Sequence, residues 1–523
     1  MNTLRQLTPR EVMFVGGETP NVYQHTAGLI MMDTSAGHRI GYESFRRHTQ
    51  ERLAGIPQFH WRLHEVPFGL DLPYWVEDEQ FSFDHHIRRI AIPSPGDHKA
   101  LGEVVSHLYC RHLDRSRPLW ELWFIEGLAD GRIALLQKMH HCMMDGQGAS
   151  KLGETIWDFE PTGAHKDIDP AIAEARPGEV PDPWQMSANT VRHLSQFPLQ
   201  AGREVFDAVK QKVFQQLSRG PKQQKKPGAP NTRFNADIGS DRGFVFGSLP
   251  LDQIKAVKGR FDVTVNDVAL ALVGGSMRHY LQARGELPDE SLRTSIAVSL
   301  RSAGDDDFSN KVTTAAVTLA TALADPVDRL LAIAQESTAA KEEAHSGHKG
   351  VLEIVQIMPP LLVNTMIRMT PGDKVAGMMG VNVVVSNVRG SPKPMYIAGA
   401  RIDAVYPMSI IAPGGGINFT CFGYADGIHF GCTIEPSLVP EPWLIIDGLH
   451  ETLAEYMSLL GKRPRSATKA GKKVRRKVAP KKVSNRKVAK AKRAAPKRKR
   501  VTGNTAAVKK KPGAKRTAAP RKS

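Results

Sequence analysis

A segment of 63 residues, 461–523, constrains the fold of this chain most, because it cannot contribute to a hydrophobic core. It carries 27 Lys or Arg residues, no Asp or Glu, and almost no large apolar side chains. Such a segment repels itself and cannot bury enough surface to offset the entropy of ordering, so we expect a disordered tail. The net charge of +18 belongs to this tail, since the other residues hold 44 basic side chains against 53 acidic ones. Any partner inferred from the charge is therefore a partner of the tail.

The remaining 460 residues are too many for one core, because single cores stop growing at about 250–300 residues. We expect an N-terminal domain at 1–160 and a C-terminal domain at 241–460, joined by a helical or irregular crossover linker at 161–240. The linker includes GPKQQKKPGAPN at 220–231, whose composition does not favour regular structure.

Three sequence features bear on the compartment. No run approaches the ~18 consecutive apolar residues of a membrane-spanning helix, and the first residues lack the apolar stretch of a secretory signal. The four cysteines have no CxxC spacing, which favours reduced thiols; they are Cys110, Cys142, Cys421 and Cys432. We therefore expect a cytoplasmic protein that is at most peripherally bound to a membrane.

Hydrophobic periodicity predicts a mixed α/β structure. The alternating residues 132–139 and the aromatic-rich run 119–125 predict two paired strands, with Asp130-Gly131 as the tight turn between them. Residues 264–281 predict a buried helix with Thr264 or Asn266 as its N-cap. Further strands are expected at 293–300, 312–319, 381–385 and 427–434, and further helices at 149–157, 182–217 and 352–369.

The strand at 132–139 leads into HHCMMDG at 140–146, the most informative stretch of the chain. Neighbours on a strand point to opposite sides, so only one of His140 and His141 can face a given cleft. A neutral imidazole can take a proton from an alcohol and return it to a leaving group. Asp145 and Gly146 suit a braced, tight turn.

Other interpretations of this stretch are open on the residues alone. A histidine on a strand is more often a satisfied polar residue than a base. A metal site is not expected, because helical metal pairs place histidines at i and i+4 and these two are adjacent. The pair His85-His86 occurs without the Asp and Gly, so adjacent histidines arise in this chain outside the full pattern.

With HHxxxDG at 140–146, the sequence resembles the bacterial wax ester synthase/acyl-CoA:diacylglycerol acyltransferases over roughly residues 5–455. Five further blocks carry the resemblance in the same order. They are LDRSRPLWELWFIEGLADGR, TVNDVALALVGGSMRHYL, VSLRS (298–302), NVVVSNVRG (382–390) and GGINFTCFGYADGIHFG.

The resemblance implies an α/β fold of two domains like chloramphenicol acetyltransferase, with a channel between them. It also implies His141 as general base and His140 as a positioning residue. It gives Asp145 as a brace, with Arg301 as a first candidate partner, and Gly146 as the turn residue. It gives Pro118, Leu119 and Trp120 as residues that shape the acyl or alcohol channel or pack the core. Asn266 and Asp267 either cap a buried helix at the domain interface or take a direct part in catalysis. Three residues depart from the family pattern or lack an expected role in it: Arg389, Cys421 and His429.

The implied reaction transfers a long-chain acyl group from acyl-CoA, as co-substrate and without another cofactor, to diacylglycerol or a long-chain alcohol. A covalent intermediate on Cys142 is a minor alternative, because adjacent residues on an extended chain diverge. Two other functions stay open. One is an acyltransferase of the same fold with another acceptor, and the other is a polyanion-binding protein that acts through the tail. The tail itself suits an anionic membrane or lipid-body surface, and equally nucleic acid. The sequence does not predict an oligomeric state.

Overall fold

The computed structural model describes residues 5–34, 40–143, 156–162, 176–195, 228–299, 312–345 and 380–460, together with 365, 369, 370 and 374. The chain divides into two units, Met1–Lys462 and Arg463–Ser523. The tail at 461–523 lies outside the described residues, so its disorder stays a prediction.

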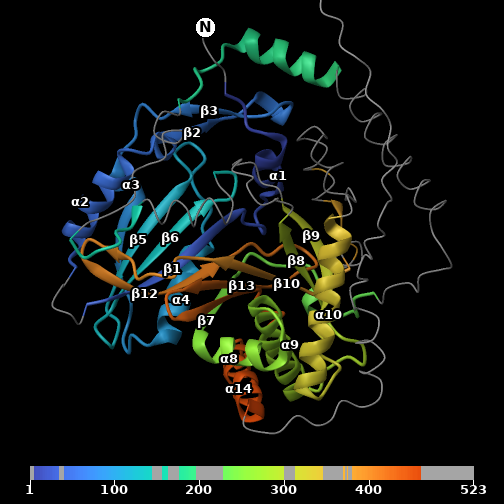
Figure 1. Cartoon of the computed structure of the whole chain (residues 1–523). Coiled ribbons are helices and arrows are strands. Elements are labelled where there is room, and N and C mark those ends of the chain that lie inside the picture. The colour runs from blue at the N-terminus through green and yellow to red at the C-terminus, as the bar shows by residue number, and fades with distance from the viewer. Residues whose placement is uncertain are drawn as a thin grey trace, which may run out of the picture. The chain divides into compact units, whose positions relative to one another are not determined.

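Two six-stranded sheets form the body (Figure 1). The first sheet has the order β11-β12-β1-β6-β5-β4. Its strands are Tyr396–Ile397, Ala400–Met408, His25–Asp33, Ile133–His140, Trp120–Glu126 and Ile87–Ala91. All of its pairs are antiparallel except β4 with β5.

The second sheet has the order β7-β14-β13-β10-β8-β9. Its strands are Gly243–Pro250, Gly427–Ile434, Ile417–Tyr424, Val383–Arg389, Arg293–Ser299 and Val312–Thr318. β10 runs parallel to both of its neighbours, β13 and β8. A separate pair, β2 (Trp61–His64) and β3 (Tyr74–Glu77), is antiparallel.

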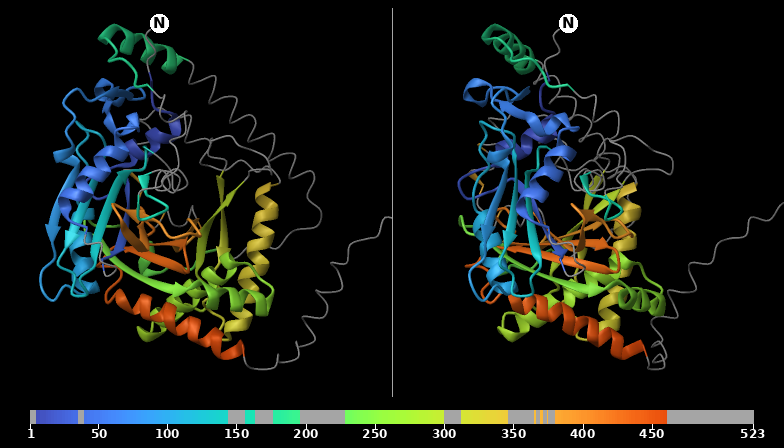
Figure 2. Two further views of the ribbon diagram at one scale, coloured as in Figure 1. Left: turned by 60° about the vertical axis from the view of Figure 1, so that its left-hand side comes forward. Right: turned by 90° about the vertical axis from the view of Figure 1, so that its left-hand side faces the viewer.

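The helices form two groups along the chain. The first half holds α1 (Pro9–Gly17), α2 (Tyr42–Leu53), α3 (Phe83–His86) and α4 (His98–Tyr109), and the short turns η1 (Pro57–His60) and η2 (Pro67–Gly69). The second half holds α8 (Leu251–Phe261), α9 (Val265–Ala283), α10 (Pro326–His345) and α14 (Trp443–Leu460), preceded by η3 (Arg233–Asn235). α14 packs against α9 and α8, as both views of Figure 2 show.

The two halves of the chain share the first sheet. β12, from the second half, pairs with β1, with Leu29 opposite Tyr406. β12 also contacts β14 and β13 of the second sheet. One hydrophobic cluster accordingly combines Leu136 of β6 and Tyr109 of α4 with Phe246 of β7. The end of β6 is therefore held by residues from both halves of the chain.

Most of the sequence-predicted elements that fall on described residues are present. β5 and β6 form the predicted antiparallel pair, and Gly131 between them has a φ of +77°. α9 begins after Thr264, which is the N-cap. The four further strands correspond to β8, β9, β10 and β14. Residues 183–195 are helical, while the rest of the helix predicted at 182–217 lies outside the described residues, as does nearly all of 149–157 and 352–369.

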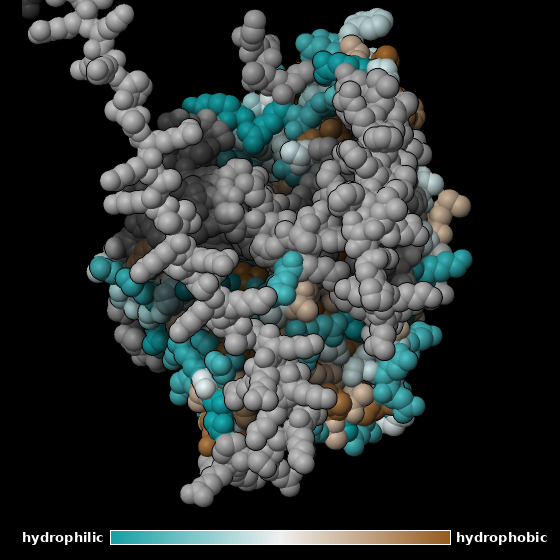
Figure 3. All heavy atoms as spheres, turned by 45° about the vertical axis from the view of Figure 1, so that its right-hand side comes forward, coloured by the Kyte–Doolittle hydropathy of each residue, from teal (hydrophilic) through white to brown (hydrophobic). Residues whose placement is uncertain are grey.

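No helix among the described residues is long and apolar enough to cross a membrane. On the face drawn in Figure 3, the coloured residues are mainly hydrophilic, with small separate groups of hydrophobic ones between them.

Candidate active site

The candidate site begins where β6 ends in a turn. The carbonyl of His140 accepts the backbone N–H of Met143 at 3.0 Å, so His141 and Cys142 are the central residues of this turn. The N–H of His140 donates to the carbonyl of Leu119, the residue before β5, and the N–H of His141 donates to the carbonyl of Gln24 at 2.8 Å. Both histidines are thus fixed by backbone hydrogen bonds to neighbouring segments.

His140 is a core residue, only 1% exposed. Its Nδ1 accepts the backbone N–H of Cys142 at 3.2 Å, which leaves the ring proton on Nε2 in the neutral form. Burial is the main cause that lowers the pKa of His140 to about 4, so the ring is neutral near pH 7. The neutral form and the fixed tautomer suit a positioning residue.

His141 has a different environment. It is only partly buried, and its ring stacks on Phe14 of α1, with ring centroids 4.1 Å apart and an angle of 11° between the planes. Phe14 thereby limits the orientations open to the imidazole. Of the two adjacent histidines, His141 is the one that solvent or a substrate can reach.

Cys142, next to His141, is sealed in an apolar cluster with Leu7, Trp61 and Leu119. It is 1% exposed, and burial raises the pKa of its thiol well above the usual value. Because the thiolate is the nucleophilic form of cysteine, this environment disfavours covalent chemistry.

A buried carboxylate lies on the other side of His140. The side chain of Glu18, which follows α1, is 7% exposed, and its Oε2 is 3.8 Å from Nε2 of His140. Arg115 donates to Glu18 Oε2 from Nε at 3.0 Å and from Nη2 at 2.8 Å, and His112 pairs with Oε1 at 3.1 Å. Burial would raise the pKa of the Glu18 carboxyl, but His140, Arg115 and the hydrogen bonds of His112 and Arg115 together lower it.

The predicted Pro-Leu-Trp positions lie beside the histidine turn. Pro118 is buried, and Leu119 packs against Cys142. Trp120, also buried, pairs across the strands with Met139 and donates its indole N–H to the carbonyl of Phe59 at 2.8 Å. These contacts connect the two family blocks through the register of β5 and β6.

The second histidine pair serves the core. His86 is 3% exposed, bonds the carbonyl of Trp120 through Nδ1 at 2.8 Å, and stacks on the Trp120 ring. The adjacent histidines that lack the Asp and Gly therefore include a packing residue that supports Trp120.

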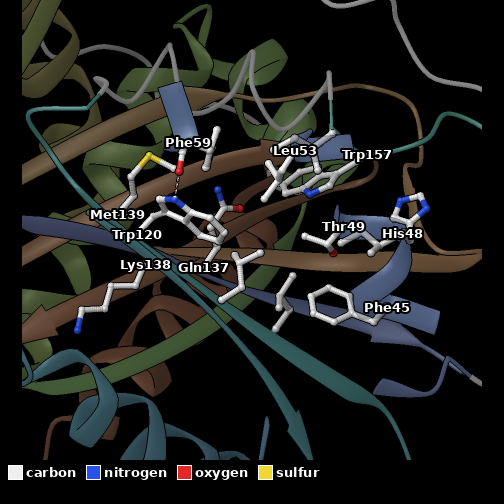
Figure 4. A pocket seen from close by; sticks show the side chains of 14 residues that line it. Phe45, His48, Thr49, Leu53, Phe59, Trp120, Gln137, Lys138, Met139 and Trp157 are labelled. Carbon is white, nitrogen blue, oxygen red and sulfur yellow. Dashed lines mark hydrogen bonds between the residues drawn. The ribbon is translucent and has the colours of Figure 1, made fainter. Parts of the chain in front are cut away.

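A mainly apolar pocket lies between α2 and the strands β5 and β6 (Figure 4). Trp120 and Met139 line it, and Met139 is two residues before His141. The space that the pocket encloses amounts to about 20 Å³, room for about one water molecule. Lys138 points away from the other side chains in Figure 4, and its Nζ bonds the carbonyls of Leu108 and Arg111. The other lining residues are Phe45, His48, Thr49, Leu53, Phe59, Leu122, Leu135, Gln137, Ile156, Trp157 and Ile397.

Asn266 and Asp267 make their contacts in the second half of the chain. Asp267 is buried and forms a reciprocal capping box with Thr264, accepting its N–H at 3.0 Å and its hydroxyl at 2.7 Å. Asn266 accepts a hydrogen bond from Asn387 of β10 at 3.2 Å. The contacts of Asp267 fit the capping role, and the Asn266 bond joins the Asn-Asp block to the NVVVSNVRG block.

The three residues without an expected role lie in the second sheet. Arg389 is exposed at the end of β10. Cys421 is fully buried, and burial raises the pKa of its thiol. His429 bonds Ser248 through Nδ1 at 2.7 Å, and burial lowers its pKa to about 4.

Several predicted residues lie outside the described residues: Asp145, Gly146 and Arg301. Their roles stay predictions. Among the residues that are described, no group of three His, Cys, Asp or Glu side chains is arranged to hold a metal ion.

Sequence reasoning missed Phe14 and Glu18. A signal for their helix exists, because Thr8 and Glu11 form a capping box around Pro9 at the start of α1. No local pattern, however, indicates that this helix packs against a turn more than a hundred residues later.

Comparisons with known proteins match the chain to one family. The family model of the wax ester synthase/diacylglycerol acyltransferase catalytic domain matches residues 7–269, and that of the WS/DGAT C-terminal domain matches 308–456. The probable diacylglycerol O-acyltransferase tgs2 of Mycobacterium tuberculosis is 33% identical over 87% of this chain and 99% of its own.

Two solved structures are similar. The wax ester synthase/diacylglycerol acyltransferase from Marinobacter aquaeolei VT8 is 26% identical, with a TM-score of 0.65 over 87% of this chain and 100% of its own. The first condensation domain of the CDA synthetase has a TM-score of 0.50 at 13% identity, over 87% of this chain and 96% of its own, a likeness of fold alone. These matches confirm the predicted α/β fold with two acyltransferase-like domains.

Proposed function

Because the chain belongs to the wax ester synthase/diacylglycerol acyltransferase family, and is thus an O-acyltransferase, we propose that it transfers a long-chain acyl group from acyl-CoA to a lipid alcohol. The acceptor is the hydroxyl of diacylglycerol, a long-chain alcohol, or both. The products are then triacylglycerol or a wax ester, and free CoA. Acyl-CoA is the co-substrate, and no other cofactor takes part.

The proposed reaction runs in one ternary complex with His141 as general base. Neutral His141 takes the hydroxyl proton of the acceptor while the hydroxyl oxygen attacks the thioester carbonyl. The tetrahedral intermediate collapses and releases CoA thiolate, which recovers the proton from His141. One ester bond forms, one thioester bond breaks, and the enzyme returns to its starting state.

The contrast between the two histidines is the observation that carries this proposal. His140 is enclosed, neutral, and committed to the backbone through Nδ1, so it cannot reach a substrate. His141, one residue later, is partly exposed and held by a ring stack and by a backbone bond to Gln24. A base in such a position acts on a bound alcohol without first having to be ordered.

The environment of Cys142 supports direct transfer. A buried thiol with a raised pKa is a poor nucleophile near neutral pH. The acyl group therefore passes from the CoA sulfur to the acceptor oxygen without a thioester intermediate on Cys142.

We propose that the pocket beside β6, whose enclosed space of about 20 Å³ holds one water-sized group, widens to receive the hydrocarbon chain of a substrate. Its aliphatic and aromatic lining suits an acyl chain, and Met139 connects it along β6 to the histidine turn. Trp120 would then form a wall of the pocket, while Pro118 and Leu119 hold that wall in place.

The test measures release of CoA from palmitoyl-CoA with dipalmitoylglycerol or hexadecanol as acceptor, and identifies the product by mass spectrometry. The proposal expects acceptor-dependent release of CoA and formation of triacylglycerol or wax ester. It also expects His141→Ala to lose about 10²–10⁴-fold in kcat, the usual contribution of a general base.

His140→Ala is the matched variant, because it removes the same ring one residue away. Activity that survives in His141→Ala but not in His140→Ala would reverse the two assignments. If neither acceptor is acylated, amines and sugars are tested next, since another acceptor class is the nearest competing function.

A further inference from the structure

Glu18 lies on the side of His140 toward which the Nε2–H of the His140 ring points. In the neutral ring Nδ1 is an acceptor, so Nε2 carries the proton. That Nε2 is buried, has no hydrogen-bond partner among the described residues, and lies 3.8 Å from Oε2 of Glu18. The distance is too long for a hydrogen bond, but at a buried site the negative charge of Glu18 still attracts the N–H dipole of the neutral ring.

The carboxylate of Glu18 is itself fixed. Arg115 donates two hydrogen bonds to its Oε2, and His112 pairs with its Oε1. Arg115 also donates to the carbonyl of Val15 at 2.6 Å, which ties the group to α1. A carboxylate held at both oxygens keeps its place and its negative charge.

The connections of this group converge on His141 from two directions. On one side, Glu18 favours the His140 tautomer whose Nδ1 accepts the N–H of Cys142, which shapes the turn that contains His141. On the other side, α1 holds Phe14 against the His141 ring. The carbonyl of Gly17, next to Glu18, accepts a hydrogen bond from the side-chain amide of Gln24. The backbone carbonyl of Gln24 in turn accepts the backbone N–H of His141.

We propose that Glu18 is a positioning residue for acyl transfer: its carboxylate, clamped by Arg115, sets the tautomer of His140 and so fixes the turn that presents His141. This inference rests on the proposed role of His141. It assigns to Glu18 an action through His140, without contact with substrate.

The test compares Glu18→Gln with Glu65→Gln in the full chain. Glu65 binds the same arginine, at Nη1 and 3.0 Å, but is exposed and sits on the side away from the Glu18 bonds. Both changes remove one carboxylate from Arg115, and only the first removes the charge that faces His140. Steady-state kinetics with palmitoyl-CoA are measured well below the melting temperature of each variant.

Glu18→Gln should lower kcat by about 10- to 100-fold, the loss of activity that follows when a group that orients a metal-bound histidine is removed. KM for palmitoyl-CoA should change less than about twofold, because Glu18 does not contact the substrate in this proposal. Glu65→Gln should keep the parent kcat. Glu18→Asp, which keeps the charge but retracts it by one methylene group, should have an intermediate kcat.

An unchanged kcat in Glu18→Gln, or an equal loss in Glu65→Gln, would overturn the proposal. If Glu18→Gln does not fold, Glu18→Asp decides alone, and parent-level kcat in that variant has the same consequence. Failure of the proposed function is separate, because the parent protein would then show no acceptor-dependent release of CoA.

Discussion

At the scale of single residues, the molecule separates two histidines that are neighbours in sequence. One peptide bond divides a ring that is sealed in the core from a ring that is partly exposed, because β6 ends at His140 and His141 lies in the turn that follows. Within β6, strand alternation places Met139 against the pocket and sends Lys138 to the opposite side, toward α4. Which histidine faces outward is therefore decided by where β6 ends.

Direct transfer predicts that Cys142 is dispensable for chemistry. Cys142→Ala removes a thiol that is buried and protonated, so kcat should stay within about threefold of the parent if the fold is kept. Intact-protein mass spectrometry after mixing the parent with palmitoyl-CoA alone should show no mass gain. A palmitoyl adduct that is absent from Cys142→Ala would establish a covalent intermediate in place of direct transfer.

The buried His429 should also make the free energy of unfolding depend on pH. Burial lowers the pKa of His429 to about 4, whereas an unfolded histidine titrates near 6.5. The unfolded chain therefore takes up this proton first as the pH falls, and the folded state loses stability between about pH 6.5 and 4. From pH 7 to pH 5 the loss from one such group is about 2 kcal/mol.

Urea denaturation at pH 7 and pH 5 measures this contribution. His429→Phe should lose about 2 kcal/mol less than the parent between the two pH values, since it has no proton to take up. His85→Phe, which alters an exposed histidine, is the control and should follow the parent. An equal loss of unfolding free energy between pH 7 and pH 5 in the parent and in His429→Phe would contradict the prediction.

At the scale of elements, the two sheets meet where backbone approaches backbone. A Cβ on Gly431 of β14 would lie 1.9 Å from the carbonyl oxygen of Pro407 in β12. No side chain can move aside there, because the opposing atom belongs to the main chain. Gly431 thus permits β12 to serve the first sheet while it packs against the second.

Gly431→Ala should accordingly destabilise the protein by about 2–3 kcal/mol, the usual cost of forcing extra volume into a packed interior. Gly28→Ala is the matched control: it lies in β1, and a Cβ there would meet nothing within 4 Å. That variant should be neutral or slightly stabilising. Equal melting temperatures for the two variants would show that β12 and β14 can separate without cost.

Local patterns predicted the elements better than their partners. The alternation before His140 and the Asp130-Gly131 turn are properties of adjacent residues, and so β5 and β6 could be predicted. The pairing of β12 with β1 joins residues more than 360 positions apart, and nothing in either strand specifies it locally. The same limit applies to Phe14 and Glu18, whose relation to the histidine turn exists only after α1 has packed.

At the scale of the whole molecule, the acidic body and the basic tail are separable in principle. α14 ends at Leu460, and the division between the two units falls at Lys462. The residues described for the candidate site, from Leu7 to His429, all precede that point. A chain that ends after α14 should therefore keep every described contact of the site.

The tail should act as an electrostatic tether. Its 27 basic and zero acidic residues would attract an anionic surface, where each basic residue contributes about 1 kcal/mol. An acidic body, by contrast, would be repelled. We expect the protein truncated after Leu460 to keep its kcat on detergent-dispersed acceptor. It should lose its salt-sensitive binding to vesicles of phosphatidylcholine with phosphatidylserine.

A change of salt concentration and a DNA-binding assay test the tether further. Raising the salt from 0.1 to 0.5 M should release the full chain from the vesicles, because added ions screen surface attraction. Binding to duplex DNA measures the competing polyanion, and should be lost in the same shortened protein. If the shortened protein still sediments with anionic vesicles at low salt as well as the full chain does, the body itself holds the surface and the tail is no tether.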